Sequence, residues 1–312
     1  MIIISYIIVC IVFGTTFLAI TLGVEAGAPP FMSAGLRFFL AGFILFFFMV
    51  LRRKAEISLL FRKEMILTGI CMTFGTYATL YWGEQYVSSG IASVLSATGP
   101  MIMIVIQTFI LGEKFRGKSL IGCLIGLGGV ILLLSSSVTF EVSSLWMIGC
   151  FVILIGVISY NSGALYSKRV IGTFKETSPI ALNAAQMMYG GGLLIFLSLF
   201  TEKLDVQSLL SMKAMGSLLY LIFIGSMVGH SLFYWLIAKT NPVFPSTALY
   251  ITPLIAISIG AIFNNEPLTW LMGIGVITTI AGTVIVNFDS LKELILNSQS
   301  FINKRNKEKL SI

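Results

Sequence analysis

The fold is decided by a stretch that occurs twice, because residues 81–100 read YWGEQYVSSGIASVLSATGP and residues 234–253 read YWLIAKTNPVFPSTALYITP. Both stretches begin with Tyr-Trp and end with proline, and they lie 153 positions apart. The match continues without a gap to residues 130 and 283 through three further pairs: Glu113 with Glu266, Gly122 with Gly275, and Gly129 with Gly282. Self-similarity at one fixed spacing is the signature of an internal repeat. The chain is therefore predicted to be a duplication.

The composition places the duplicated chain in a membrane. Hydrophobic residues make up 57% of the 312 residues and charged residues only 11%, whereas soluble domains carry about 25% charged residues. A membrane-spanning helix needs about 20 mostly apolar residues. Ten stretches approach this requirement: 2–22, 31–51, 65–86, 89–111, 119–135, 146–167, 178–200, 214–238, 243–263 and 268–287. We therefore predict an all-α integral membrane protein with ten transmembrane helices.

The cysteines indicate neither a disulfide nor a metal site. All four lie inside predicted helices and lack the paired spacing of a zinc site or a redox pair: Cys10, Cys71, Cys123 and Cys150. We interpret them as small buried apolar residues. No metal and no other cofactor is predicted.

The lysines and arginines predict how the chain is oriented, since cytoplasmic loops retain positive charge. With the N-terminus in the cytoplasm, the inner segments hold 17 of the 20 cations. The outer loops hold Lys203 and Lys213, and Arg37 lies within a helix. We therefore predict a plasma-membrane protein with both termini cytoplasmic. The net charge of +7 follows this membrane rule, so nucleic-acid binding is not expected.

An odd number of helices in each copy has a consequence for the architecture. With five helices per copy, the second copy enters the membrane from the opposite side, so the two repeats are inverted. Residues 1–137 form the first five-helix repeat and residues 146–288 the second. Inverted repeats are typical of secondary transporters, whose halves alternate access to a site near the midplane of the bilayer. Residues 289–312 form a basic tail that either lies on the anionic inner leaflet or is disordered.

Several separated motifs occur in order along the first copy. They are Phe13–Ile20 (FGTTFLAI), Gly35–Phe38 (GLRF), residues 81–90 (YWGEQYVSSG), and Pro100 followed by Gly112-Glu113-Lys114. Together they resemble the EamA-type permeases of the drug/metabolite transporter superfamily, over about residues 3–287. The resemblance implies a carrier that exports amino acids, nucleobase-like metabolites or drugs. The second copy departs from the pattern at Asn264-Asn265-Glu266-Pro267, so a role of the family's glutamate is less secure there.

Two equivalent prolines are predicted at the middle of the fourth and ninth helices. Pro100 and Pro253 lack an amide hydrogen, so each frees the carbonyl four residues earlier, at Ser96 and Leu249. In a membrane such backbone must face other helices or a water-filled cavity. We predict that the two prolines are hinges beside the transport pathway. A static kink packed against its neighbours is the alternative.

The third and eighth helices each carry a polar and aromatic stripe with four-residue spacing. Tyr77 and Tyr81 are equivalent to His230 and Tyr234 under the 153-residue shift. Residues four apart lie on one face of a helix, so we expect these four side chains to line the pathway. His230 is the only histidine, and an intramembrane histidine is a candidate for binding solute or carrying a coupling proton. Helix packing is the alternative role.

A buried cation is predicted in the second helix. Placing Arg37 near the bilayer centre costs about 3 kcal/mol, so it needs a partner. Glu84, at the outer end of the third helix, is the expected partner, and the two residues are predicted to form a gate, a coupling element or a site for a zwitterion. A purely structural ion pair is the alternative. Further candidates for the pathway are the small polar or aromatic residues Thr15, Asn161 and Tyr250, for which helix packing is again the alternative.

Small residues and carboxylates at helix contacts have structural interpretations. Gly122 with Gly126, and Gly225 with Gly229, have the spacing of close helix contacts. They predict helix packing and leave homodimerisation open. Glu113 and Glu266 are expected to cap the helices that follow them, because carboxylates are favoured at helix N-termini.

These features together favour a secondary transporter that exports small organic metabolites, such as amino acids or drug-like amphipathic solutes. Protons are the candidate coupling ion. An integral-membrane enzyme is disfavoured because the sequence offers no paired carboxylates, metal cluster or nucleophile with a base at membrane depth. A passive facilitator or channel for small solutes remains the alternative function.

Overall fold

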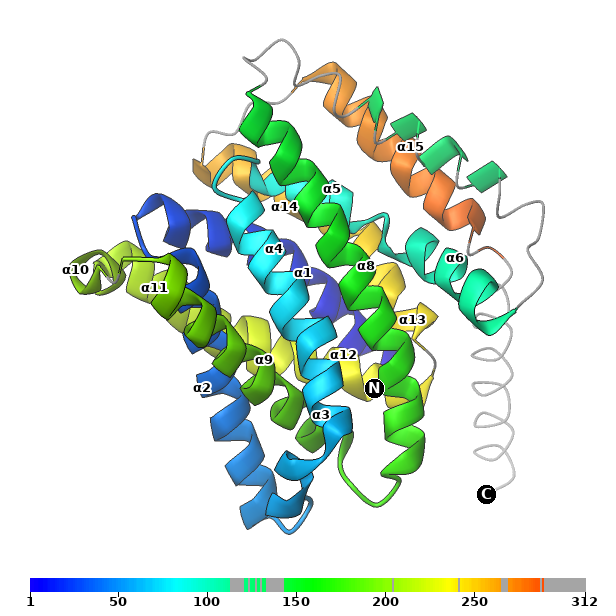
Figure 1. Ribbon diagram of the computed structural model, residues 1–312. Coiled ribbons are helices and arrows are strands. Elements are labelled where there is room, and N and C mark those ends of the chain that lie inside the picture. The colour runs from blue at the N-terminus through cyan, green and yellow to red at the C-terminus, as the bar shows by residue number, and fades with distance from the viewer. Residues whose placement is uncertain are drawn as a thin grey trace, which may run out of the picture.

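The computed structural model describes residues 1–112, 143–203, 205–240, 242–264, 269–286 and 288, with short pieces at 121–122, 124–126, 128–129 and 131–132. Within these residues every regular element is a helix (Figure 1). Seven stretches are long and apolar enough to cross a membrane: Ile2–Glu25, Pro30–Leu51, Ser89–Thr108, Ser144–Thr173, Pro179–Thr201, Met212–Lys239 and Phe244–Phe263. The chain is an all-α, multi-pass membrane protein. The count of ten helices and the orientation remain predictions.

The chain opens with two uninterrupted helices, α1 (Ile2–Glu25) and α2 (Pro30–Leu51). Between them Gly27 has a φ of 82°, a conformation that favours glycine because it has no Cβ. Pro30 occupies the first turn of α2, where the missing amide hydrogen has no helical partner to lose. The short 3-10 helix η1 (Ile57–Phe61) then leads toward the third predicted span.

The third and eighth predicted spans share a design that the sequence did not reveal. Each is a continuous helical path with a π-helical middle: α3 (Lys63–Thr68), η2 (Gly69–Gly75) and α4 (Thr76–Gly83), then α11 (Met212–Tyr220), η4 (Leu221–His230) and α12 (Ser231–Lys239). Moving η2 along the chain by 153 positions places it inside η4. A π-helix is rare and occurs frequently at functional sites. Both copies therefore carry the same widened turn at the same place.

The fourth and ninth predicted spans are interrupted rather than continuous. The pieces are α5 (Ser89–Ser96) and α6 (Gly99–Leu111), then α13 (Val243–Ser246), the 3-10 helix η5 (Thr247–Tyr250) and α14 (Thr252–Asn264). Pro100 and Pro253 are each the second residue of the later helix. The prolines thus lie at the breaks inside the predicted spans 89–111 and 243–263, and their role as hinges stays a prediction. The first turn of a helix tolerates proline, so each helix ends just before the proline and a new one begins there.

Long helices complete the second half of the chain. They are α8 (Ser144–Thr173) and α9 (Pro179–Thr201), followed after the short α10 (Val206–Leu209) and the spans above by α15 (Trp270–Val286). The hydroxyl of Ser143 accepts a hydrogen bond from the amide of Trp146 and so caps α8. This helix lies beside α4 (Figure 1) and runs six residues beyond its predicted end at 167.

Two helices from different copies cross in close contact, α2 with α9 (Figure 1). A Cβ added at Gly42 would lie 2.7 Å from the carbonyl oxygen of Ala184, and one at Gly191 would lie 2.9 Å from that of Gly35. Gly42 is equivalent to Gly191, and Gly35 to Ala184, because each pair lies 149 positions apart. The two contacts are therefore the same contact, made once from each copy. Only glycine allows this approach of the two backbones.

The described pieces 121–122, 124–126 and 128–129 lie alongside α15 (Figure 1). A Cβ at Gly282 would lie 2.6 Å from the carbonyl oxygen of Gly122, and one at Gly129 would lie 2.8 Å from that of Gly275. Gly129 is equivalent to Gly282, and Gly122 to Gly275, at a spacing of 153 positions. These two contacts are therefore also equivalent in the two copies. The glycine spacing predicted for packing is thus used within the chain, and homodimerisation stays a prediction.

Some predictions concern residues outside the described part of the chain. They are the capping roles of Glu113 and Glu266, the burial of Cys123, and the basic tail 289–312.

Candidate functional site

A cavity of about 60 Å³ lies among the helices on which the pathway was predicted. Its walls come from α1, α4, α5, α8 and η5: Phe13, Thr16, Phe17, Thr76, Tyr77, Leu80, Ser96, Val157, Tyr160, Asn161 and Leu249. One water needs about 10–15 Å³ of such space, so the cavity has room for a few waters. Sites that hold small molecules measure about 300–1,000 Å³. An organic solute can therefore occupy this place only if the surrounding helices move apart.

The interrupted helices contribute directly to this cavity. Ser96 is the last residue of α5, and Leu249 lies in η5. They are equivalent residues, and both line the cavity. Their carbonyls are the two that the prolines were predicted to free. The helix breaks thus lie where the cavity is.

A hydrogen bond joins the two copies through equivalent residues of the third and eighth spans. The Tyr77 hydroxyl lies 2.7 Å from Nε2 of His230. The ring of Phe38 packs against both partners, with centroid distances of 4.3 Å to Tyr77 and 5.4 Å to His230. His230 ends the π-helical segment η4, and Tyr77 follows η2. The widened turns therefore present the two residues to each other.

Arg37 of α2 lies beside this pair and is fully buried, with 0% of its surface exposed. Its Nε donates a hydrogen bond to the Ser226 hydroxyl at 2.9 Å, and the guanidinium carbon lies 5.1 Å from the centre of the Tyr77 ring. Nη1 and Nη2 have no hydrogen-bond partner among the described residues. Gly225 makes room for the guanidinium, since a Cβ there would lie 3.0 Å from Nη2.

The other copy contains the counterpart of this contact. Thr73 is equivalent to Ser226, and Gln186 is equivalent to Arg37. The Thr73 hydroxyl donates to the side-chain oxygen of Gln186 at 2.8 Å, and the Gln186 amide donates to Asn183 at 3.0 Å. Both ends of the Gln186 amide are thus hydrogen-bonded, whereas two nitrogens of Arg37 are not.

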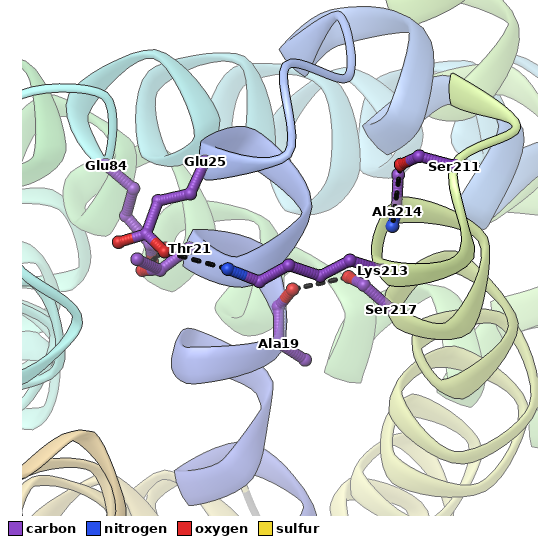
Figure 2. Close-up of polar contacts among 8 residues, drawn as sticks. All are labelled: Ala19, Thr21, Glu25, Glu84, Ser211, Lys213, Ala214 and Ser217. Carbon is purple, nitrogen blue, oxygen red and sulfur yellow. Dashed lines mark hydrogen bonds and ion pairs between the residues drawn. The ribbon is translucent and has the colours of Figure 1, made fainter. Parts of the chain in front are cut away.

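Glu84 lies just beyond the end of α4, where α1 also ends (Figure 2). Its Oε2 accepts a hydrogen bond from the Thr21 hydroxyl at 3.0 Å. Nearby Lys213 forms an ion pair with Glu25 at 3.3 Å, and the Ser217 hydroxyl donates to the carbonyl of Ala19. These contacts join α1 to α4 and α11. Arg37 donates to Ser226 and Glu84 accepts from Thr21, and the expected pairing of Arg37 with Glu84 stays a prediction.

Asn161 is the candidate of α8 and does line the cavity. Its amide nitrogen donates to the carbonyl of Val157 at 2.7 Å. The Asn161 side-chain oxygen and the neighbouring Tyr160 hydroxyl are buried and have no hydrogen-bond partner in the described part of the chain. They are polar groups of the cavity-lining residues that lack a partner within the described residues.

Five pathway candidates lie outside the wall of the cavity, and His230 is one of them, reaching it only through its bond to Tyr77. Thr15 points to the Tyr220 hydroxyl, at 2.5 Å. Tyr81 packs edge-on against Tyr77, with ring centroids 6.5 Å apart. Tyr234 and Tyr250 are buried in α12 and η5. The sequence missed several wall residues that neighbour its candidates or share a helix face with them: Phe13, Thr16, Phe17, Thr76 and Tyr160. The spacing of three and four residues from Phe13 to Thr16 and Phe17 was the available signal.

The comparison with known proteins covers nearly the whole chain. A model of the EamA-like transporter family matches residues 1–135 and 147–288. The protein named "Uncharacterized inner membrane transporter YedA" from Escherichia coli (strain K12) is 32% identical over 276 residues, which are 86% of this chain and 85% of that protein. The "Probable amino-acid metabolite efflux pump" of the same strain is 25% identical, with 89% of this chain and 92% of the pump covered.

A solved structure, titled "Crystal structure of protein", has the same fold. Its TM-score is 0.66 over 93% of this chain and 97% of that chain, at 15% sequence identity.

Proposed function

The chain belongs to the EamA-like transporter family and is a membrane transporter, and we propose that it is a secondary carrier for small organic solutes. The observation that carries the proposal is the position of the cavity. It lies where two equivalent helices are interrupted, next to a hydrogen bond between equivalent residues of the two copies. A site of this kind, at the interface of repeats and beside discontinuous helices, is typical of secondary transporters.

The transport cycle we propose is alternating access between inverted repeats of five helices, with both termini cytoplasmic. The pairs Gly42–Ala184 and Gly191–Gly35 change places when the copies are exchanged. A molecule with such internal symmetry has two related arrangements, in which the copies exchange roles and the cavity opens to opposite faces. The breaks before Pro100 and Pro253 supply the hinges, since the halves of each helix can tilt separately there.

The solutes we propose are amphipathic and small, such as amino acids, and they leave the cell across the plasma membrane. Aromatic walls from Phe13, Phe17 and Tyr160 fit an apolar side chain, and Asn161 offers a polar contact. One relative is named an amino-acid metabolite efflux pump, which supports the direction and the solute class. His230 would bind solute or carry the coupling proton.

Counterflow in reconstituted vesicles tests this proposal. Purified protein in liposomes loaded with an unlabelled amino acid should accumulate the same labelled amino acid transiently, and the rate should saturate with concentration. An Asn161→Leu variant should reduce this accumulation about tenfold, because losing one buried hydrogen bond costs about 1.4 kcal/mol. Ser162→Ala is the matched control, because the Ser162 hydroxyl bonds only to its own helix at Ile158. Linear, unsaturable flux without counterflow would identify a channel instead.

A further inference from the structure

The guanidinium of Arg37 carries donors that the described residues leave without a partner. The side chain is fully buried and its Nε donates to Ser226. The Tyr81 hydroxyl lies close by, yet Nη1 and Nη2 have no partner at hydrogen-bond geometry among the described residues. Burying a charged donor without a partner is costly in any protein interior, and the cost is greater in a membrane. An ionisable group inside the membrane with unused donors is by default a candidate for a functional site.

Packing between α2 and the eighth span does not require a cation at this position. The equivalent position in the other copy holds the neutral Gln186, whose side-chain oxygen accepts a hydrogen bond from the Thr73 hydroxyl. The side-chain nitrogen of Gln186 also has a partner, since it donates to Asn183. The two copies thus build the same contact, and only one of them has donors left over. This difference separates the structural part of the contact from an added binding function.

The position of Arg37 connects it to the cavity through one residue. Tyr77 lines the cavity, and its ring also lies 5.1 Å from the guanidinium carbon. In this arrangement the Tyr77 hydroxyl is bonded to His230. A solute that expands the cavity has to displace wall residues, and displacement of Tyr77 would give it access to Nη1 and Nη2.

The charges near Arg37 limit what it can bind. The groups that face it are Ser226 of η4, Tyr77 and Tyr81 of α4, and His230 at the end of η4. Glu84 is a carboxylate whose charge acts on the same Tyr81, and it accepts a hydrogen bond from Thr21. A guanidinium binds a carboxylate through two parallel N–H···O bonds, and the two terminal nitrogens are the pair left for this geometry.

We infer that Arg37 binds the carboxylate of the transported solute, so the solutes are small amphipathic molecules that carry one carboxylate. The inference rests on the proposed carrier function. Recognition by Arg37 makes the carboxylate the common feature of the solutes, and the aromatic cavity leaves the rest of the molecule variable.

The test is a counterflow panel with matched pairs of solutes. Phenylalanine, leucine and methionine are compared with phenylalaninamide, leucinamide and methioninamide, in which an uncharged amide replaces the carboxylate. Uncharged drug-like amphiphiles complete the panel. The wild-type protein should transport solutes with a carboxylate about tenfold to a hundredfold better than their amides, the range of a charge-assisted pair.

Two variants assign this preference to Arg37. Arg37→Gln places at this site the residue that the other copy uses, so the contact with Ser226 and the fold should be kept. It should reduce the preference to less than threefold by slowing the acids and not the amides. Gln186→Leu is the control at the equivalent position, and it should leave the preference unchanged. Thermal melting of each purified variant verifies that the protein is folded.

The outcomes distinguish this inference from the carrier function itself. Transport of amides as fast as acids by the wild type, or an unchanged preference in folded Arg37→Gln, would overturn the role of Arg37 and leave the carrier intact. A purely structural ion pair with Glu84 predicts that second result. Absence of saturable counterflow for every solute would refute the carrier function, and the inference with it.

Discussion

Two equivalent hydrogen bonds, Thr73 to Gln186 and Arg37 to Ser226, show what duplication keeps and what it changes. Each joins a π-helical segment of one copy to the long helix beside it from the other copy. The first is neutral and hydrogen-bonded at both ends of the amide, whereas the second buries a charge with two donors unused. The shared geometry belongs to the fold, and the difference in charge is the basis for the binding role that we propose for Arg37.

The residues one turn later show the same relation. Tyr77 and His230 are equivalent, yet they differ chemically and bond to each other. Identical residues at this position could not offer both an imidazole and a phenol. Substitutions at these residues should separate the helix packing that both copies share from the features that only one copy has.

The largest effect should come from the close packing of α2 against α9, which both copies share. Gly191→Ala places a methyl group within 3.0 Å of the backbone of α2, so α2 and α9 must separate, at a cost of about 3 kcal/mol. We expect a strongly lowered melting temperature and poor yield of folded protein.

Gly192→Ala is the matched control for this change. Its nearest neighbour would be 3.9 Å away, and replacing glycine by alanine in a helix stabilises by about 1 kcal/mol. The melting temperature of this variant should therefore stay the same or rise. Equal melting temperatures for both variants would mean that the close crossing of α2 and α9 is not needed.

A smaller effect should follow from breaking the bond between the copies. Tyr77→Phe and His230→Gln should each lower counterflow about tenfold, because each leaves a buried polar partner without its bond. The double variant should be little worse than either single one, since both remove the same interaction. If the two losses multiply instead, the residues act independently. His230→Gln should also flatten the pH profile of transport if His230 carries the coupling proton, and an unchanged profile would exclude that role.

The helix breaks should have a more moderate effect. Pro100→Ala and Pro253→Ala restore an amide hydrogen at each break, which favours a continuous helix. Transport should slow severalfold while the melting temperature rises or stays constant. Wild-type rates in both variants would show that the breaks are static and have no role as hinges.

The smallest effects should come from the two equivalent hydroxyls, and they should differ in kind. Thr73→Val leaves the oxygen of Gln186 without its partner, which should cost about 1 kcal/mol of stability and leave the affinity for solutes unchanged. Ser226→Ala releases Nε of Arg37 and should weaken the affinity for carboxylate solutes about threefold. Melting curves and concentration series of counterflow measure the two quantities. The same effect from both variants would erase the functional difference between the copies.

Part of this site could be predicted from the sequence, because a fixed shift pairs residues by arithmetic. The 153-residue shift alone pairs Tyr77 with His230. The wall residues Ser96 and Leu249 followed from the chemistry of proline. The shift could not show that Arg37 donates to Ser226, because this depends on which rotamer the neighbouring helices leave open.

Other features had no signal in the sequence. Apart from His230, the π-helical turns η2 and η4 consist of apolar, small and hydroxyl residues, which fit an α-helix equally well. Thr15 and Thr16 point about 100° apart around the helix, and the sequence alone does not show which of them faces the cavity. Only the packing of α1 places Thr16 on the cavity and Thr15 against Tyr220.

The accessibility of one cavity residue from the two faces of the membrane tests the carrier account most directly. Ser96→Cys, with the native cysteines replaced by serine, would be treated in vesicles with a thiol reagent that cannot cross the membrane, from outside and separately from inside. Alternating access predicts labelling from both faces, slowed by a transported solute. Labelling from one face only, with or without solute, would contradict it.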